Sequence, residues 1–275
     1  MRTFSGRTAV VTGAGSGIGR ALAMELARRG AHVAASDVDA AGVEAAVADI
    51  TARGGTAKAW TLDVTDADAV QRHADEVAEA FGGVHLVINN AGIALAARAV
   101  EQTAAQVSRV IDVDLVGVVN GTQAFLPHLL ASGDGHLVNI SSLFGLVAMP
   151  YNSAYNAAKF GVRGYTESVA IELAASRAPV GVTCVHPGGV KTGIAASAEV
   201  VDGNQGLATA FEKMLRMPPE RAAEIILRGV QRGRRRQLVG IDAWALHVTQ
   251  SALGARWTDV MGFLGRRVVP RHPRG

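Results

Sequence analysis

The fold is decided near the start of the chain, where a short apolar run passes through a glycine-rich loop into a helical pattern. The stretch reads Thr8-Ala9-Val10-Val11-Thr12-Gly13-Ala14-Gly15-Ser16-Gly17-Ile18-Gly19. Its valines and threonines favour a strand over residues 8–12, and the apolar spacing after the loop predicts a helix over residues 18–29. Glycine suits the tight turn between them because it lacks a Cβ atom.

The same alternation of β-rich runs and alanine-rich helical runs continues to about residue 240. The helix over residues 66–81 is marked by an N-cap at Thr65 or Asp66 and by Gly82-Gly83 at its end. Strands separated by helices form a parallel sheet covered on both faces. We therefore expect an α/β fold, a doubly wound, Rossmann-type parallel sheet of seven strands with helices on both faces. The candidate strands cover residues 8–12, 32–37, 57–62, 86–89, 136–140, 180–185 and 237–239.

Length and composition narrow the remaining possibilities. A chain of 275 residues with 19% charged residues and a net charge of +3 is typical of one globular domain over residues 1–275, with no general case for nucleic acid or membrane binding. Cys184 is the only cysteine, so neither an intrachain disulfide nor a thiolate metal cluster can form. No apolar run reaches the length of a membrane span, and no secretory signal stands at the start. The expectation is a cytoplasmic protein without an integral membrane segment and without a metal.

The glycine loop predicts a dinucleotide site. Gly13, Gly17 and Gly19 lie where a pyrophosphate would meet the N-terminal amides of the helix. Asp37 ends the second strand, where an acidic side chain accepts hydrogen bonds from the adenosine ribose and repels a 2′-phosphate. Ser16 occupies a loop position where a basic residue could have paired with that phosphate. NAD is therefore expected rather than NADP, although Asp37 could instead cap the next helix.

Two residues later in the chain predict acid–base chemistry. Tyr155 and Lys159 are four residues apart, so on a helix they project from the same face. A neighbouring ammonium favours the phenolate and brings the pKa of the phenol toward working pH. Ser142 lies thirteen residues before Tyr155. A lone pair of this spacing is common on helices, so the other segments decide its meaning.

In combination these segments resemble the short-chain dehydrogenase/reductase family. They occur in family order between residue 6 and about residue 195. The matching segments are Thr12 to Gly19, Asp63-Val64, Asn89-Asn90-Ala91-Gly92, Ser142, Tyr155-Asn156-Ala157-Ala158-Lys159 and Pro187-Gly188-Gly189-Val190-Lys191-Thr192.

The resemblance implies a role for each matching residue. Tyr155 would be the general acid/base, Lys159 would lower its pKa and bind the nicotinamide ribose, and Ser142 would hydrogen-bond the substrate oxygen. The resemblance also implies a homodimer or homotetramer. The implied contacts to the cofactor are Gly13, Ser16, Gly17, Ile18, Gly19, Asp37, Asp63, Val64, Asn90, Ala91, Gly92, Tyr155, Lys159, Pro187, Gly188, Val190 and Thr192.

The chain departs from the family pattern at one position. Where the family carries an asparagine that is thought to hold a water beside the lysine, this chain has Asp114. An ionised carboxylate accepts hydrogen bonds but cannot donate them, so the relay is expected to be altered. Alternatively, the charge of Asp114 stabilises Lys159 directly or through water.

The substrate side is predicted less sharply. Residues 93–96 and 143–151 are apolar and would border the cleft, which suggests a hydrophobic alcohol or ketone, or they could simply be core. A mobile lid is expected over about 193–217. An amphipathic C-terminal extension is expected over about 241–275, for protein contact rather than a membrane surface. The arginine cluster over residues 228–236 is expected to be a solvated helix end rather than a nucleic-acid site.

The sequence thus predicts an NAD-dependent oxidoreductase that transfers a hydride between the cofactor and a secondary alcohol or ketone. The alternative is a non-catalytic dinucleotide-binding protein, which Asp114 alone encourages. The intact set of Ser142, Tyr155 and Lys159 argues against that alternative.

Overall fold

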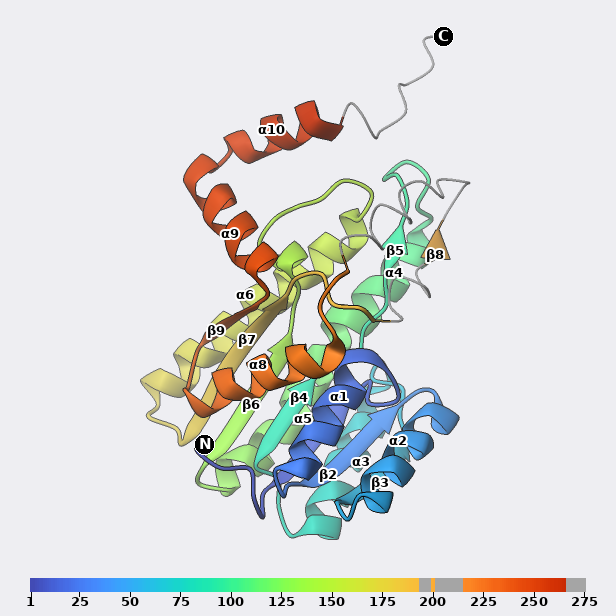
Figure 1. Cartoon of the computed structure of the whole chain (residues 1–275), viewed down its shortest axis with the longest axis vertical. Coiled ribbons are helices and arrows are strands. Elements are labelled where there is room, and N and C mark those ends of the chain that lie inside the picture. The colour runs from blue at the N-terminus through green and yellow to red at the C-terminus, as the bar shows by residue number, and fades with distance from the viewer. Residues whose placement is uncertain (193–198, 201–214, 266–275) are drawn as a thin grey trace.

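The computed structural model describes residues 1–192, 199–200 and 215–265, and its centre is a parallel sheet of seven strands (Figure 1). The strand order is β3-β2-β1-β4-β6-β7-β9, and every neighbouring pair is parallel. The expected fold class is confirmed, with strand boundaries that differ from the prediction by at most two residues. The strands are β1 (Thr8–Thr12), β2 (His32–Asp37), β3 (Thr56–Thr61), β4 (Leu86–Asn89), β6 (Gly135–Ile140), β7 (Val180–Pro187) and β9 (Arg236–Val239).

Helices cover both faces of the sheet. One apolar cluster joins the sheet to α1, α2 and α8, and a second joins it to α3, α5 and α6. Neighbouring strand residues point to opposite faces, so Val10 belongs to the second cluster while Ala9 and Val11 belong to the first. The helices are α1 (Gly17–Arg28), α2 (Ala40–Ala52), α3 (Ala67–Phe81), α4 (Ala104–Ile111), α5 (Gly117–Ala131), α6 (Ser153–Ala175), α8 (Pro219–Gln231), α9 (Ile241–Leu253) and α10 (Arg256–Gly265).

Helix α3 shows how local sequence fixes an element. Of the two candidate caps, Asp66 is the N-cap, and its carboxylate accepts a hydrogen bond from Ala69 N at 2.9 Å. Gly82 follows the helix with a φ of +74°, in the left-handed region that glycine adopts at low cost. Val70, Ala74 and Val77 are buried against the sheet, as the spacing predicts.

Several short elements lie beyond the carboxyl ends of the strands. A π-helix (Asp112–Val116) joins α4 to α5, and a 3-10 helix (Leu143–Gly145) follows β6. Strand β5 (Leu95–Ala96) pairs with β8 (Glu199–Val200), which falls within the predicted lid. The rest of that lid, over residues 193–198 and 201–214, lies outside the described residues.

The C-terminal extension forms α9 and α10, which lie at the top of the view in Figure 1. Trp257 is buried against the 3-10 segment, whereas Trp244 is 59% exposed and Phe263 is 63% exposed. The extension therefore has an apolar side packed on the domain and apolar residues left on its surface. No helix in the described part of the chain has the length and apolar composition needed to cross a bilayer. The dimer or tetramer stays a prediction, and residues 266–275 lie outside the described residues.

The arginine cluster lies between α8 and β9, as expected. Arg228 pairs with Glu224, and Arg236 pairs with Glu167, while Arg232, Arg234 and Arg235 are exposed. This is the amino end of β9, whereas the glycine loop lies at the carboxyl ends of the parallel strands. The cluster is therefore separated from the cleft described below.

Candidate active site

The glycine loop connects β1 to α1 and leaves room for close approach of a ligand. Gly13 has a φ of +66° and Gly17 a φ of +52°, so both backbones are in the left-handed region. A Cβ atom on Gly19 would overlap the carbonyl oxygen of Gly13. Ser16 is the N-cap residue of α1, yet its hydroxyl makes no capping hydrogen bond, and the first turn carries no acidic side chain. The positive end of α1 is thus suited to an anion such as a pyrophosphate.

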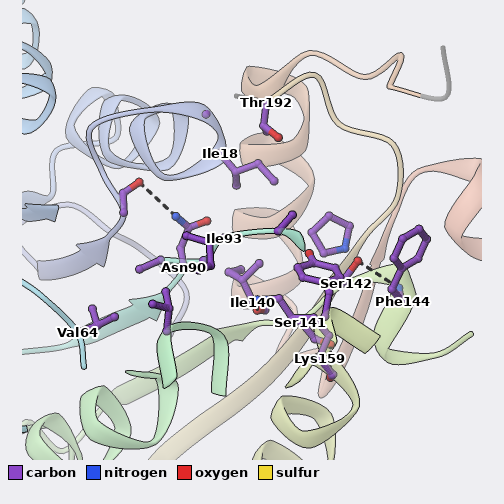
Figure 2. A pocket seen from close by; sticks show the side chains of 18 of the residues that line it. Ile18, Val64, Asn90, Ile93, Ile140, Ser141, Ser142, Phe144, Lys159 and Thr192 are labelled. Atoms are coloured by element: carbon purple, nitrogen blue, oxygen red, sulfur yellow. Dashed lines mark hydrogen bonds between the residues drawn. The ribbon is translucent and has the colours of Figure 1, made fainter. Parts of the chain in front are cut away.

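The loop after β4 is fastened to the glycine loop. The Thr12 hydroxyl accepts hydrogen bonds from Asn90 N at 2.9 Å and from Ala91 N at 3.1 Å. The Asn90 side-chain amide donates to the carbonyl oxygens of Thr12 and Gly13. Figure 2 marks one hydrogen bond of this amide. A Cβ atom on Gly13 would lie 2.9 Å from that amide nitrogen. The two loops therefore hold one another in place.

Asp37 forms a hydrogen bond with the glycine loop. One carboxylate oxygen accepts from Gly15 N at 2.9 Å, and the other accepts from Asp39 N at 3.0 Å. The N-cap residue of α2 is Asp39, not Asp37, so the alternative of a helix cap is wrong. Asp63 accepts from both the backbone and the hydroxyl of Thr65, which makes it a turn residue beside the cleft.

Tyr155 and Lys159 occupy the first turns of α6, as predicted. The ammonium nitrogen of Lys159 lies 5.5 Å from the centroid of the Tyr155 ring. Ser142 follows β6, and its Oγ accepts a hydrogen bond from Phe144 N at 3.1 Å (Figure 2). The Phe144 ring meets the Tyr155 ring edge-on, with centroids 6.1 Å apart. The serine, the phenol and the ammonium are thereby brought together from two elements.

Asp114 makes a direct ion pair with Lys159. Its Oδ2 lies 3.0 Å from the Lys159 ammonium, and both side chains are buried, at 0% and 3% exposure. Its Oδ1 accepts from Ile93 N at 2.7 Å. Lys159 also donates to the carbonyl oxygen of Ile140 at 3.3 Å. Of the two possibilities left open by the sequence, the direct contact is the one observed. The carboxylate lies in the π-helix, a conformation that is frequent at functional sites.

Burial and charge act against one another in this group. Burial has the largest effect on Tyr155 and raises its pKa, and the negative charge of Asp114 raises the pKa further. The ammonium of Lys159 and a hydrogen bond with Ser142 lower the pKa. The net result is a pKa above that of a free phenol. Burial alone would lower the pKa of Lys159, but the neighbouring carboxylate of Asp114 and the Tyr155 phenol together outweigh burial and hold that pKa above its usual value. Lys159 is thus kept as a cation.

One cavity of about 1060 Å³ joins the glycine loop to the tyrosine. Its volume lies at the upper end of the range common for small-molecule sites. Two predicted residues do not line it: Gly19 packs under the loop, and Asp114 lies behind Lys159. The predicted residues that do line it are Gly13, Ser16, Gly17, Ile18, Asp37, Asp63, Val64, Asn90, Ala91, Gly92, Ser142, Tyr155, Lys159, Pro187, Gly188, Val190 and Thr192.

The expected substrate segments divide between cavity and core. Ile93, Ala94, Leu143 and Phe144 line the cavity. Residues 146–147 and Leu95 are buried in apolar clusters instead. The sequence left open whether these apolar segments line the cleft or form core, and the structure shows that each segment does both.

Some cavity residues were missed at the sequence level. Asn152, Leu215 and Asp242 line the cavity with Tyr155, and Arg109 lines it from α4. Asp242 follows the last strand and Gly240, and that position beyond the carboxyl end of a strand was the available signal. The others depend on how the surrounding helices pack.

The residues present fit a nicotinamide dinucleotide. Positive-φ glycines leave backbone space at the end of α1, Asp37 stands at the carboxyl end of β2, and the tyrosine and lysine line the same cavity. In a doubly wound sheet this edge is where dinucleotides bind. The start of α1 suits the phosphates, Asp37 suits a ribose, and the tyrosine and lysine suit the nicotinamide end of the cofactor.

Comparison with known proteins agrees with this geometry. The family model for short chain dehydrogenase matches residues 7–201. A protein of Mycobacterium tuberculosis named SadH, classed by its name as an oxidoreductase, is 51% identical over 260 residues, which is 94% of each chain. A cyclohexanol dehydrogenase of an Acinetobacter species is 36% identical over 197 residues, covering 71% of this chain and 78% of that protein.

Solved structures agree as well. A short-chain dehydrogenase/reductase from Burkholderia phymatum, in complex with NAD, superposes with a TM-score of 0.83 at 28% identity over 100% of both chains. A metagenomic short-chain oxidoreductase in complex with NADP gives 0.71 at 29% identity over 86% of this chain and 97% of that one. The chain therefore belongs to the short-chain dehydrogenase/reductase family, oxidoreductases that bind a nicotinamide dinucleotide.

Proposed function

We propose that the protein is an NAD-dependent oxidoreductase that interconverts an uncharged, hydrophobic secondary alcohol and its ketone. The observation that carries this proposal is that Ser142, Tyr155 and Lys159 line one cavity with the glycine loop. A bound nicotinamide would supply the hydride acceptor for the alcohol carbon and the hydride donor for the ketone carbon. Intact acid–base residues in that cavity favour catalysis over the non-catalytic alternative.

The chain itself moves the proton. During alcohol oxidation the hydroxyl proton passes to the Tyr155 oxygen while the hydride leaves the carbon, and during ketone reduction the proton returns. Ser142 would bind the substrate oxygen and orient it toward the phenol. Lys159, kept as a cation by Asp114, stabilises the phenolate. Apolar side chains at Ile93 and Phe144 would exclude water from the reacting carbon.

The residues suited to hold the cofactor follow from the cavity. The amides at the start of α1 would bind the pyrophosphate, Asp37 the adenosine ribose, and Lys159 the nicotinamide ribose. The segment from Pro187 to Thr192 would hold the carboxamide. A screen of secondary alcohols with NAD and with NADP, followed by the absorbance of the reduced cofactor, tests the proposal. Activity confined to NADP or absent with every alcohol would contradict it.

Cofactor choice is tested at Asp37. We expect wild type to have a far higher kcat/KM for NAD than for NADP. In Asp37→Asn the NAD-to-NADP ratio of kcat/KM should fall about tenfold, because the amide lacks the charge that repels a 2′-phosphate. The asparagine oxygen can still accept from Gly15 N in the glycine loop, while the acceptor for Asp39 N is lost. Asp39→Asn is the matched control, since Asp39 lies two residues further on and does not line the cavity. The measurement is kcat/KM for each cofactor. An unchanged ratio in Asp37→Asn would remove Asp37 from cofactor selection.

Asp114 is expected to set the pH range of the reaction. Alcohol oxidation requires deprotonated Tyr155, so the rate rises as pH passes upward through the pKa of that phenol. The carboxylate of Asp114 raises this pKa, and Asp114→Asn removes that charge. The alkaline rise should therefore move to lower pH in Asp114→Asn, which keeps an acceptor for Ile93 N. Matched pH–rate profiles are the measurement, and coincident profiles would place Asp114 outside the relay.

A further inference from the structure

Asp242 connects the C-terminal extension to the cavity. It is the second residue of α9, and its Oδ2 accepts a hydrogen bond from Gly189 N at 2.7 Å. A Cβ atom on Gly188 would overlap this carboxylate, and a Cβ atom on Gly240, whose φ is +109°, would overlap its Oδ1. Two glycines thus leave the space that the carboxylate occupies. Asp242 and the turn at Gly188-Gly189 fit one another closely.

Core packing holds α9 in this position. Ala243, the next residue, is fully buried, and it belongs to the apolar cluster that contains Phe144 and contacts Tyr155. Leu246, one turn further along α9, packs against the same cluster. The helix start is therefore fixed beside the tyrosine by apolar contacts, and Asp242 lines the cavity from there.

Asp242 also contributes charge to the cavity wall. The positive charge of Lys159 is balanced by the carboxylate of its buried partner Asp114, and Asp37 stands at the far end by β2. Arg109 and Asp112 line the cavity from α4 and the π-helix and carry opposite charges. Two basic residues lie near the turn formed by Gly188 and Gly189: Arg216 donates its backbone N–H to the Gly189 carbonyl oxygen, and Lys191 follows two residues later. Neither of them lines the cavity, whereas the carboxylate of Asp242 does.

We propose that Asp242 is a positioning and specificity residue of the substrate end: it fixes the Gly188-Gly189 turn through one oxygen, and its negative charge disfavours anionic alcohols and ketones. The inference rests on the proposed function and deepens it. It gives a physical reason for the exclusion of anionic substrates and makes α9 part of the substrate site.

The first test separates the charge from the hydrogen bond. Two probes of the same ring are compared, 4-hydroxycyclohexanecarboxamide and 4-hydroxycyclohexanecarboxylate. We expect wild type to have a higher kcat/KM for the amide than for the carboxylate. In Asp242→Asn the amide-to-carboxylate ratio of kcat/KM should fall about threefold to tenfold, because asparagine can still accept from Gly189 N but carries no charge. Added salt should narrow the ratio in wild type, because it screens an exposed charge.

Asp259→Asn is the matched control, because Asp259 is an exposed acid of α10 that does not line the cavity. It should leave the ratio at the wild-type value. A ratio that is equal in wild type and Asp242→Asn, or that changes equally in Asp259→Asn, would overturn the specificity role.

The second test examines the positioning role by a binding measurement that requires no catalytic turnover. NADH affinity, measured by its fluorescence, should fall more in Asp242→Ala than in Asp242→Asn, because only alanine removes the acceptor for Gly189 N. This measurement also distinguishes the two levels of inference. If wild type binds NADH but oxidises no alcohol, the proposed function fails while the affinity comparison still decides the positioning role. Equal NADH affinity in the two variants would overturn it.

Discussion

Tyr155→Phe should lower the turnover of a secondary alcohol by about a hundredfold to ten-thousandfold while leaving NADH affinity close to that of wild type. General acid–base catalysis contributes an effect of this size. Phenylalanine keeps the ring that packs edge-on against Phe144 and lies beside Lys159, so the substitution removes the transferable proton and little else. The measurement is kcat for alcohol oxidation together with NADH binding by fluorescence.

Tyr165→Phe is the matched control for this experiment. Tyr165 lies on the same helix, packs in the cluster beneath the sheet and forms a hydrogen bond with Thr122, away from the cavity. Its loss of a hydroxyl should affect stability more than turnover. Wild-type turnover in Tyr155→Phe would remove the tyrosine from the chemistry.

The second large effect is one of stability. Asp114→Ala should lower the free energy of unfolding by about 3–5 kcal/mol, because it leaves the buried ammonium of Lys159 without its counterion. It also removes the acceptor for Ile93 N. Asp114→Asn should cost less, since the amide oxygen can still accept from Ile93 N or from the ammonium. Chemical denaturation followed by circular dichroism measures all of these variants.

Asp112→Ala provides the comparison. Asp112 lies two residues earlier in the same π-helix and is exposed, so its removal should change stability by no more than about 0.5 kcal/mol. Similar losses in Asp112→Ala and Asp114→Ala would mean that the ion pair contributes nothing beyond local helix propensity. A loss confined to Asp114→Ala would support the buried pair as a structural requirement as well as a catalytic one.

Much of the fold was predictable because the central strands β1, β4 and β6 are buried, β-rich runs bounded by turn residues. The local preferences of the β1 valines for a strand and of the following glycines for a turn agree with the places of these residues in the fold. The same agreement holds for Asp66 and Gly82, which begin and end α3. Strand ends were less certain, since pairing rather than propensity decides them. Strand β7 continues to Pro187 because β9 pairs with it up to Val239.

The site was predictable where its residues follow strand ends in fixed order. Tyr155 and Lys159 lie together because a helix turn brings residues four apart onto one face. The contact between Asp114 and Lys159 joins segments 45 residues apart in the sequence, so no local pattern could distinguish a direct pair from a water-mediated one. Asp242 was missed for a similar reason: its place depends on how Ala243 packs the start of α9 against the apolar cluster that contains Phe144.

The central claim is that Tyr155 exchanges a proton with a secondary alcohol beside a nicotinamide cofactor. The most direct measurement is the initial rate of NADH formation by wild type over a panel of uncharged cyclic and aliphatic secondary alcohols, with Tyr155→Phe run at the same enzyme concentration. We predict saturable NADH formation with at least one alcohol in wild type and a near-background rate in the variant. Equal rates in the two proteins, or no NADH from any alcohol with a wild type that binds NAD, would contradict the account.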